Sequence, residues 1–221
     1  MRAAILLVLC VVLSSAPVDV EGAQRRRTPA PKPKPAPVPA LKTEAPQIKC
    51  NELLGTGVRT NATFCFVLAG RDPAQGVIVT VPPHVGAATL TFSLHNRHTY
   101  SEEEMRAGRG FAKYTAVIGV LSMEGNLLGR GAVQSEFRAT KDLYDRVSGG
   151  AGPGGVKAVA PIGNESVVVS IPADVQQVSL LGEVLEAITA AGREAAAPGR
   201  PVAIVSNLQL EYRPAPPARK R

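Results

Sequence analysis

Apolar and polar residues alternate along most of the chain between residues 47 and 213. In the run 88–95, for example, Leu90, Phe92 and Leu94 alternate with polar residues. Successive side chains of a strand point to opposite faces, so this pattern predicts strands with one buried face. The same reasoning predicts strands at 61–69, 76–81, 88–95, 113–123, 132–140, 156–161, 166–171 and 201–212.

The segment 113–123 is apolar on both faces and rich in β-branched residues, which is typical of a central strand. Ser101, followed by three glutamates, has the pattern of a helix N-terminus. Short strands separated by Gly, Pro and Asn turns favour an all-β fold. We therefore predict an antiparallel β-sandwich, jelly-roll-like, with one or two short helices.

The segment 174–191 fits two structures. It could be a helix capped by Asp174, since apolar residues recur at helical spacing. It could instead be a strand at 178–185, followed by a short helix or loop within 185–197. In the helical alternative, the apolar residues on one face would be Val175, Val178, Leu181, Leu185 and Ile188. We favour the strand.

Both ends of the chain differ from this body. Arg2 precedes an apolar run at 3–13, which is too short to span a bilayer and fits a signal peptide at 1–23. Residues 24–46 alternate proline with basic residues, and residues 214–221 are similar, so a disordered linker and tail are expected. The sequence thus predicts a domain at 47–213 in a secreted, periplasmic or cell-envelope protein, without a transmembrane span in the mature chain.

The positive charge belongs to the ends of the chain. The net charge is +7, yet residues 47–213 carry 15 Lys and Arg and 15 Asp and Glu. A nucleic-acid-binding domain usually carries a basic patch with aromatic residues among the charges. Because the body is neutral and the chain has no tryptophan, we do not expect a nucleic-acid partner.

Three cysteines are present, and Cys10 lies within the predicted signal peptide. Export would leave Cys50 and Cys65 as an even pair, which predicts a disulfide. Two free thiols are the alternative, and a zinc site is disfavoured because a second cysteine pair is lacking.

The three histidines, His84, His95 and His98, raise the possibility of a metal centre. Three neutral imidazoles suffice for a catalytic zinc ion, provided that the chain turns at Asn96-Arg97 and brings His98 beside His95. The alternative is a solvated sheet edge followed by a loop. The zinc hypothesis implies a metal-dependent hydrolase.

Asp142 and Asp145 are candidates for a calcium site, with carbonyls of the glycine-rich loop at 149–155 as further ligands. The twelve-residue calcium-loop pattern is absent, so an ordinary turn is the alternative. The possible ions are therefore calcium and zinc, and no other cofactor is expected.

The loops at 95–109 and 141–155 are the expected ligand-binding surface, because loops on a rigid sandwich commonly carry function. Sugar sites commonly use exposed aromatic rings, for which Phe111, Tyr114 and Tyr212 are further candidates. The predicted ligand-binding residues are His95, Arg97, His98, Tyr100, Arg106 and Tyr144.

No motif of a known hydrolase, such as Gly-x-Ser-x-Gly or His-Glu-x-x-His, is present, and no catalytic residue is predicted. We therefore expect an exported, non-enzymatic binding module for a surface glycan, a cell-envelope polymer or a protein partner. The metal-dependent hydrolase is one alternative, and a structural or assembly subunit of the cell envelope is another.

Overall fold

The computed structural model describes residues 38–147 and 158–216. Within these ranges the secondary structure is almost entirely β, with one short α-helix and two 3-10 turns. The elements are β1 (Lys42–Glu44), β2 (Gln47–Lys49), β3 (Leu53–Thr56), β4 (Thr63–Leu68), η1 (Pro73–Gln75), β5 (Val77–Thr80), β6 (Ala88–Tyr100), α1 (Glu102–Arg106), β7 (Ala112–Ser122), β8 (Leu127–Phe137), η2 (Thr140–Asp142), β9 (Ala158–Ile171), β10 (Gln177–Thr189), β11 (Gly192–Ala195) and β12 (Pro201–Tyr212).

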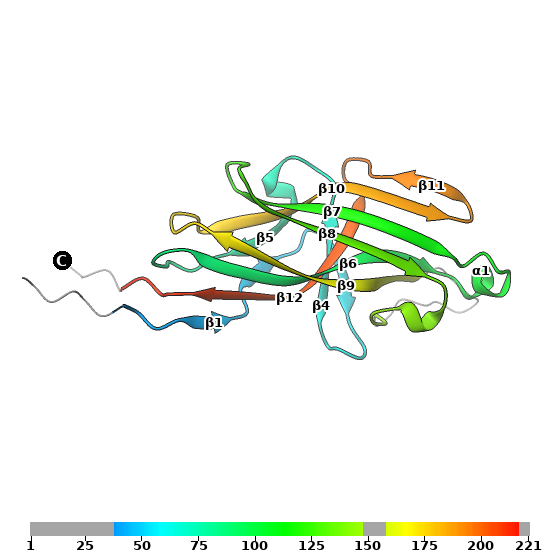
Figure 1. Cartoon of the computed structure of the whole chain (residues 1–221), viewed down its shortest axis with the longest axis horizontal. Coiled ribbons are helices and arrows are strands. Elements are labelled where there is room, and N and C mark those ends of the chain that lie inside the picture. Colours follow the sequence, from blue (N-terminus) through cyan, green and yellow to red (C-terminus); the bar gives the residue numbers. More distant parts are fainter. Residues whose placement is uncertain (1–37, 148–157, 217–221) are drawn as a thin grey trace, which may run out of the picture. The chain divides into compact units, whose positions relative to one another are not determined.

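The strands form two sheets that pack face to face (Figure 1). The first has the order β3-β4-β12-β6-β9, with β1 added to β12. The second has the order β2-β5-β10-β7-β8, with β11 added to β10. The strand pairs are antiparallel. This confirms the predicted all-β sandwich with a short helix.

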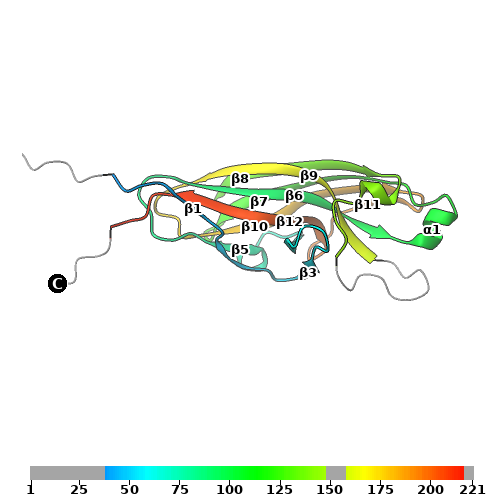
Figure 2. The same ribbon diagram turned by 90° about the horizontal axis from the view of Figure 1, so that it is seen from below.

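The main core lies between the two sheets and is built from the apolar faces that the alternation predicted. Leu90, Phe92 and Leu94 of β6 are all buried in it. From the other sheet, Ile118 and Leu180 pack into the same cluster. Figure 2 shows β8 and β9 running next to each other along one side of the two layers. The predicted inward face of the 88–95 run is therefore confirmed.

The chain does not turn at Asn96-Arg97, as the zinc hypothesis would require. β6 continues as one strand to Tyr100, paired with β9 throughout. A bulge absorbs the irregularity, since Leu94 pairs with Glu165 while Asn96 pairs with Ile162. The two strands expected at 156–161 and 166–171 are accordingly one strand, β9, and Gly163 with its φ of +68° forms part of the bulge.

The segment 174–191 is a strand, as favoured, but no helix follows it. β10 runs to Thr189 and turns into β11, which pairs back onto its last residues. Gly192 has a φ of +122°, which only glycine adopts easily, and this allows the tight hairpin. The expected helix N-terminus is confirmed: Ser101 caps α1, accepting a hydrogen bond from the amide of Glu104.

The prediction of a disordered linker up to residue 46 is wrong for its last part. Lys42–Glu44 pair with Tyr212–Leu210 as β1, because the run after the prolines can complete the edge of β12. Pro214 of the expected tail forms a bridge to His84. The predicted signal peptide, the first part of the predicted linker and the last residues of the predicted tail lie outside the described residues. Among the described residues, no helix has the length and apolarity needed to cross a membrane.

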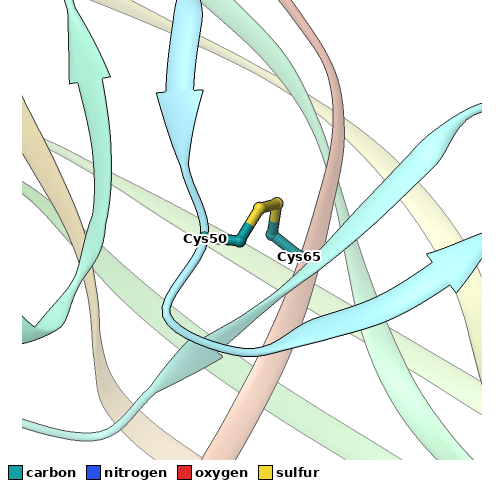
Figure 3. The surroundings of a disulfide bond; sticks show 2 residues. All are labelled: Cys50 and Cys65. Atoms are coloured by element: carbon teal, nitrogen blue, oxygen red, sulfur yellow. A yellow bond between two sulfur atoms is a disulfide. The ribbon is translucent and has the colours of Figure 1, made fainter.

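Cys50 and Cys65 form the predicted disulfide, with a Cα–Cα distance of 5.6 Å (Figure 3). Cys50 directly follows β2 of the second sheet, and Cys65 lies in β4 of the first. Cys65 is fully buried in the main core. The bridge therefore joins the end of β2, an edge strand of the second sheet, covalently to β4 of the first sheet.

Candidate functional site

The end of β6 places two buried histidines on opposite faces of its sheet. His98 points into the space between the sheets, where Tyr114 and Phe137 pack against it. His95 packs on the other side against Phe64 and Tyr144. This separation follows from strand geometry, since residues an odd number of positions apart face opposite ways.

His98 and Tyr114 form a buried, neutral hydrogen-bonded pair. Nδ1 of His98 lies 2.8 Å from the hydroxyl of Tyr114, and the imidazole stacks on Phe137 at a centroid distance of 3.8 Å. Burial lowers the pKa of His98 to about 4. Burial also raises the pKa of Tyr114 to about 12. At neutral pH, the pair thus holds its hydrogen bond without carrying charge.

A cavity of about 240 Å³ opens beside this pair, at the end of the sandwich where α1 and the β10–β11 hairpin lie. Its wall combines polar and apolar groups from both sheets. Leu185 and Ala187 of β10 form part of the apolar wall, with Met105 of α1. The polar and aromatic lining includes Arg97, His98, Tyr114, Glu194 and Phe111.

Hydrogen bonds and an ion pair hold several polar groups of this cavity in place. Arg97 donates through Nε to the carbonyl of Pro201, at 3.2 Å. Glu104 pairs with Arg109, whose Nε lies 2.8 Å from its carboxylate. Phe111 leaves 43% of its surface exposed, so its ring faces both the cavity and solvent. The arrangement can hold a small molecule that has polar groups and an apolar face.

His95 stabilises the fold through hydrogen bonds of both of its ring nitrogens. Its Nδ1 lies 2.6 Å from the carbonyl of Gly163 and therefore donates to it, so Nε2 accepts from the hydroxyl of Ser206 at 2.9 Å. Both side chains are fully buried. Burial lowers the pKa of His95, and the hydrogen bond to Gly163 opposes this only in part. The imidazole thus ties the β9 bulge to β6 and β12.

The structure does not bring the three histidines together. His84 lies in the loop after β5, with hydrogen bonds to the carbonyls of Pro82 and Pro172. His95 and His98 occupy opposite faces because β6 does not turn between them. No group of three His, Cys, Asp or Glu side chains in residues 38–147 and 158–216 is placed to hold a metal ion. The convergence of three imidazoles that the zinc hypothesis requires is therefore not present among these residues.

Asp142 and Asp145 use their carboxylates for backbone contacts. Asp142 accepts from the amides of Arg138 and Ala139 at the start of η2. Asp145 is 4% exposed and accepts from the amides of Arg59, Thr60 and Arg146 and from the hydroxyl of Thr60. Each carboxylate thus stabilises a turn through the backbone amides that it accepts from. The glycine-rich loop lies outside the described residues.

Of the predicted ligand-binding residues, only Arg97 and His98 line the cavity. Tyr100 packs edge-on against Phe137, at a centroid distance of 6.1 Å. Arg106 is exposed and pairs with Glu102 on α1. Tyr144 lies on the other face with His95, and its ring is 5.9 Å from the guanidinium of Arg59.

Sequence reasoning missed the part of the cavity wall that the β10–β11 hairpin forms. Glu194 and the hairpin alanines come from a segment for which the pattern left helix, strand and loop open. Phe111 and Tyr114 were recognised as aromatic candidates, but the position of Tyr114 beside His98 depends on how the two sheets pack against each other. A signal for the hairpin exists in Gly192, which follows the apolar run of β10.

The sequence matches no family model and no curated protein. Among solved structures, the chain is similar to VP2 of infectious bursal disease virus, as a subviral particle, with 16% identity over 79% of this chain and 33% of that chain and a TM-score of 0.22. It is also similar to the enzymatically active domain of tailspike protein 4 of bacteriophage CBA120, with 10% identity over 77% of this chain and 19% of that chain and a TM-score of 0.20. The chain thus spans a third or less of the length of these proteins.

Proposed function

We propose that the chain is an exported, non-enzymatic binding module that holds one ring-sized unit of a surface glycan. The observation that carries the proposal is the cavity at the α1 end, where a partly exposed phenylalanine and fixed polar groups line the same space. Export is supported by the signal-like N-terminus of the sequence.

The cavity's size favours a small ligand unit. Its volume is about 240 Å³, whereas sites for drug-sized ligands usually measure about 300–1,000 Å³. A single sugar ring, with the rest of the chain outside, suits such a space better than a large cofactor.

The chemistry of the lining matches a sugar. Sugar rings present apolar C–H faces that pack on aromatic rings, and Phe111 supplies such a surface. Hydroxyls need donors and acceptors, which Arg97 and Glu194 provide. Among the described residues, Nε2 of His98 has no hydrogen-bond partner, so it can bond to a hydroxyl in either tautomer.

The pKa values of His98 and Tyr114 suit ligand binding better than acid–base catalysis. A general acid or base works best when its pKa is near the operating pH. The pKa of His98 is about 4, and that of Tyr114 is about 12, both far from neutrality. The pair is suited to hold a hydrogen bond in place.

The test is a glycan array probed with the purified chain, followed by titration calorimetry with the best-bound oligosaccharide. Phe111→Ala and Arg97→Ala should each weaken binding about tenfold, a loss of about 1.4 kcal/mol in binding free energy. Leu127→Ala is the matched control, since Leu127 is 44% exposed and lies outside the cavity.

Binding that is weakened equally by all three substitutions would place the ligand elsewhere on the molecule. A chain that binds no glycan on the array would contradict the proposed ligand class. Hydrolysis of the bound oligosaccharide during the titration would contradict the non-enzymatic assignment.

A further inference from the structure

The second half of β9 is a free sheet edge. β9 ends the order of its sheet, with β6 on one side only. The first half of its other side is covered, because Leu143 bridges Ile162 and the amide of Tyr144 donates to the carbonyl of Pro161 at 2.9 Å. Within the described residues, no strand covers this side from Ser166 to Ile171.

Beyond the bulge at Gly163, this edge lacks the charges and prolines that usually prevent strand addition. Natural edge strands carry charges or prolines, or are very short. Residues 166–171 read Ser-Val-Val-Val-Ser-Ile, without a charge or a proline. Val168 points outward and is 65% exposed. An uncovered edge of this composition is an open template for another strand.

The neighbouring edge, β8, is different. β8 runs beside β9, since Gly131 faces the side chain of Val167 and Gly129 that of Val169. Between them, β8 presents Arg130, which pairs with Glu183 at 2.8 Å. These charges thus disfavour the addition of a strand to β8, whereas residues 166–171 of the neighbouring β9 carry no charge. The pairing of Arg130 also limits its repulsion of a second copy.

The free stretch is self-complementary. The sequence of residues 166–170, Ser-Val-Val-Val-Ser, is the same in both directions. In an antiparallel pair centred on Val168, each serine meets a serine and each valine meets a valine. The exposed valine would then be covered by its own copy, with a hydroxyl pair on each side.

We propose that a second copy of this chain pairs with β9 along this edge, antiparallel and centred on Val168. Such a contact is isologous, so it closes into a dimer with a twofold axis and does not extend further. It joins the first sheets of both copies into one continuous sheet. The dimer carries two copies of the end cavity, but it depends on none of the cavity's residues.

The register can be tested by cysteine cross-linking in the chain carrying Cys10→Ser. Residues directly opposite in an antiparallel pair have Cα atoms about 4.5–5.5 Å apart, within the range of a disulfide. Val168→Cys should therefore oxidise to a covalent dimer. Ser166→Cys alone should not, because two copies of residue 166 lie about 13 Å apart along the strands. A mixture of Ser166→Cys and Ser170→Cys chains should give the heterodimer.

A second test measures association without cross-linking. Sedimentation equilibrium should show a dimer whose dissociation constant rises about tenfold or more in Val168→Lys, because like charges then lie opposite each other. Val58→Lys is the matched control, since Val58 is 64% exposed and lies outside the strands. It should leave the dimer unchanged.

Three results would overturn the proposal. The first is a monomer at all concentrations up to about 1 mM together with no cross-linking of Val168→Cys. The second is equal cross-linking of Ser166→Cys and Val168→Cys, which contradicts the register. The third is growth beyond the dimer, which contradicts the closed contact. None of these results bears on glycan binding by the cavity.

Discussion

Nδ1 of His98 lies 2.8 Å from the phenolic oxygen of Tyr114, and this contact joins the two sheets at the cavity end of the sandwich. His98 belongs to β6 of the first sheet and Tyr114 to β7 of the second. Both side chains are buried, at 4% and 8% exposure. A buried polar pair of this kind is stable only while both partners stay neutral.

The imidazole should make the stability of the fold depend on pH. The pKa of His98 is about 4 in the folded chain and 6.5 in the ordinary state. Below pH 6.5 the unfolded chain binds a proton that the folded chain does not, so the free energy of unfolding falls as pH falls towards 4. From this one group, urea denaturation should show a loss of about 2 kcal/mol between pH 7.5 and pH 5.0.

Two variants separate this effect from the hydrogen bond. His98→Gln keeps a polar partner for Tyr114 but does not titrate, so the pH-dependent loss should shrink by about 2 kcal/mol. Tyr114→Phe should lower stability by about 1 kcal/mol at both pH values and keep the wild-type pH dependence. An unchanged pH dependence in His98→Gln would show that the buried imidazole is not its source.

Asp145 lies outside the strands, yet its buried carboxylate should contribute strongly to the free energy of unfolding. Burial alone would raise the pKa of its carboxyl, but hydrogen bonds from Thr60, Arg59 and Arg146 hold the pKa below its ordinary value. Asp145→Asn loses the charge and part of the accepting capacity, and should cost about 2 kcal/mol of unfolding free energy at pH 7. The stabilisation is present above pH 3.8 and is lost as pH falls through the lower folded pKa.

The control for Asp145 is Asp174→Asn. Asp174 is exposed, and its side chain makes no hydrogen bond within the described residues, so the change should stay within about 0.5 kcal/mol. Adding Ca²⁺ should leave the melting temperature unchanged, because the oxygens of Asp145 already face backbone donors. A calcium-dependent rise in Tm that Asp145→Asn removes would restore the calcium hypothesis.

The disulfide should contribute about 3 kcal/mol in the chain-entropy model, as expected for a loop of about 15 residues. Peptide mass analysis without reduction should show Cys50 linked to Cys65. Reduction should lower the midpoint of urea unfolding of the wild-type chain. In Cys50→Ser, reduction should have no further effect. A wild-type chain with two free thiols on labelling would contradict the bridge.

The sequence predicted most of the strands because burial imposes a period of two, as in the run Leu90, Phe92 and Leu94. It failed at Asn96-Arg97, where polar residues continue β6 beside the β9 bulge. That continuation depends on a strand more than sixty residues away in sequence, which no local pattern shows. The cavity could be predicted only in part for the same reason: His98, Tyr114 and Glu194 meet through long-range pairing.

Gly182 of β10 illustrates how closely the sheets approach. A Cβ atom at this position would lie 2.0 Å from Cγ2 of Val202, which is fully buried on β12. Gly182→Ala should therefore cost about 1–3 kcal/mol of unfolding free energy by overpacking. Gly70→Ala is the control, because its Cβ would lie 3.5 Å from Leu181, an ordinary contact.

Combining the change with Val202→Ala tests the cause. Removing the two methyl groups of Val202 makes room for the new Cβ, so the double variant should be more stable than the two separate losses predict, with a coupling of about 1 kcal/mol or more. Urea denaturation of the four chains of this cycle gives that coupling. Additive losses would mean that Gly182 is needed for the backbone conformation of β10, whose pairing with β7 shifts register between Gly182 and Val184, and that its contact with Val202 is not the reason.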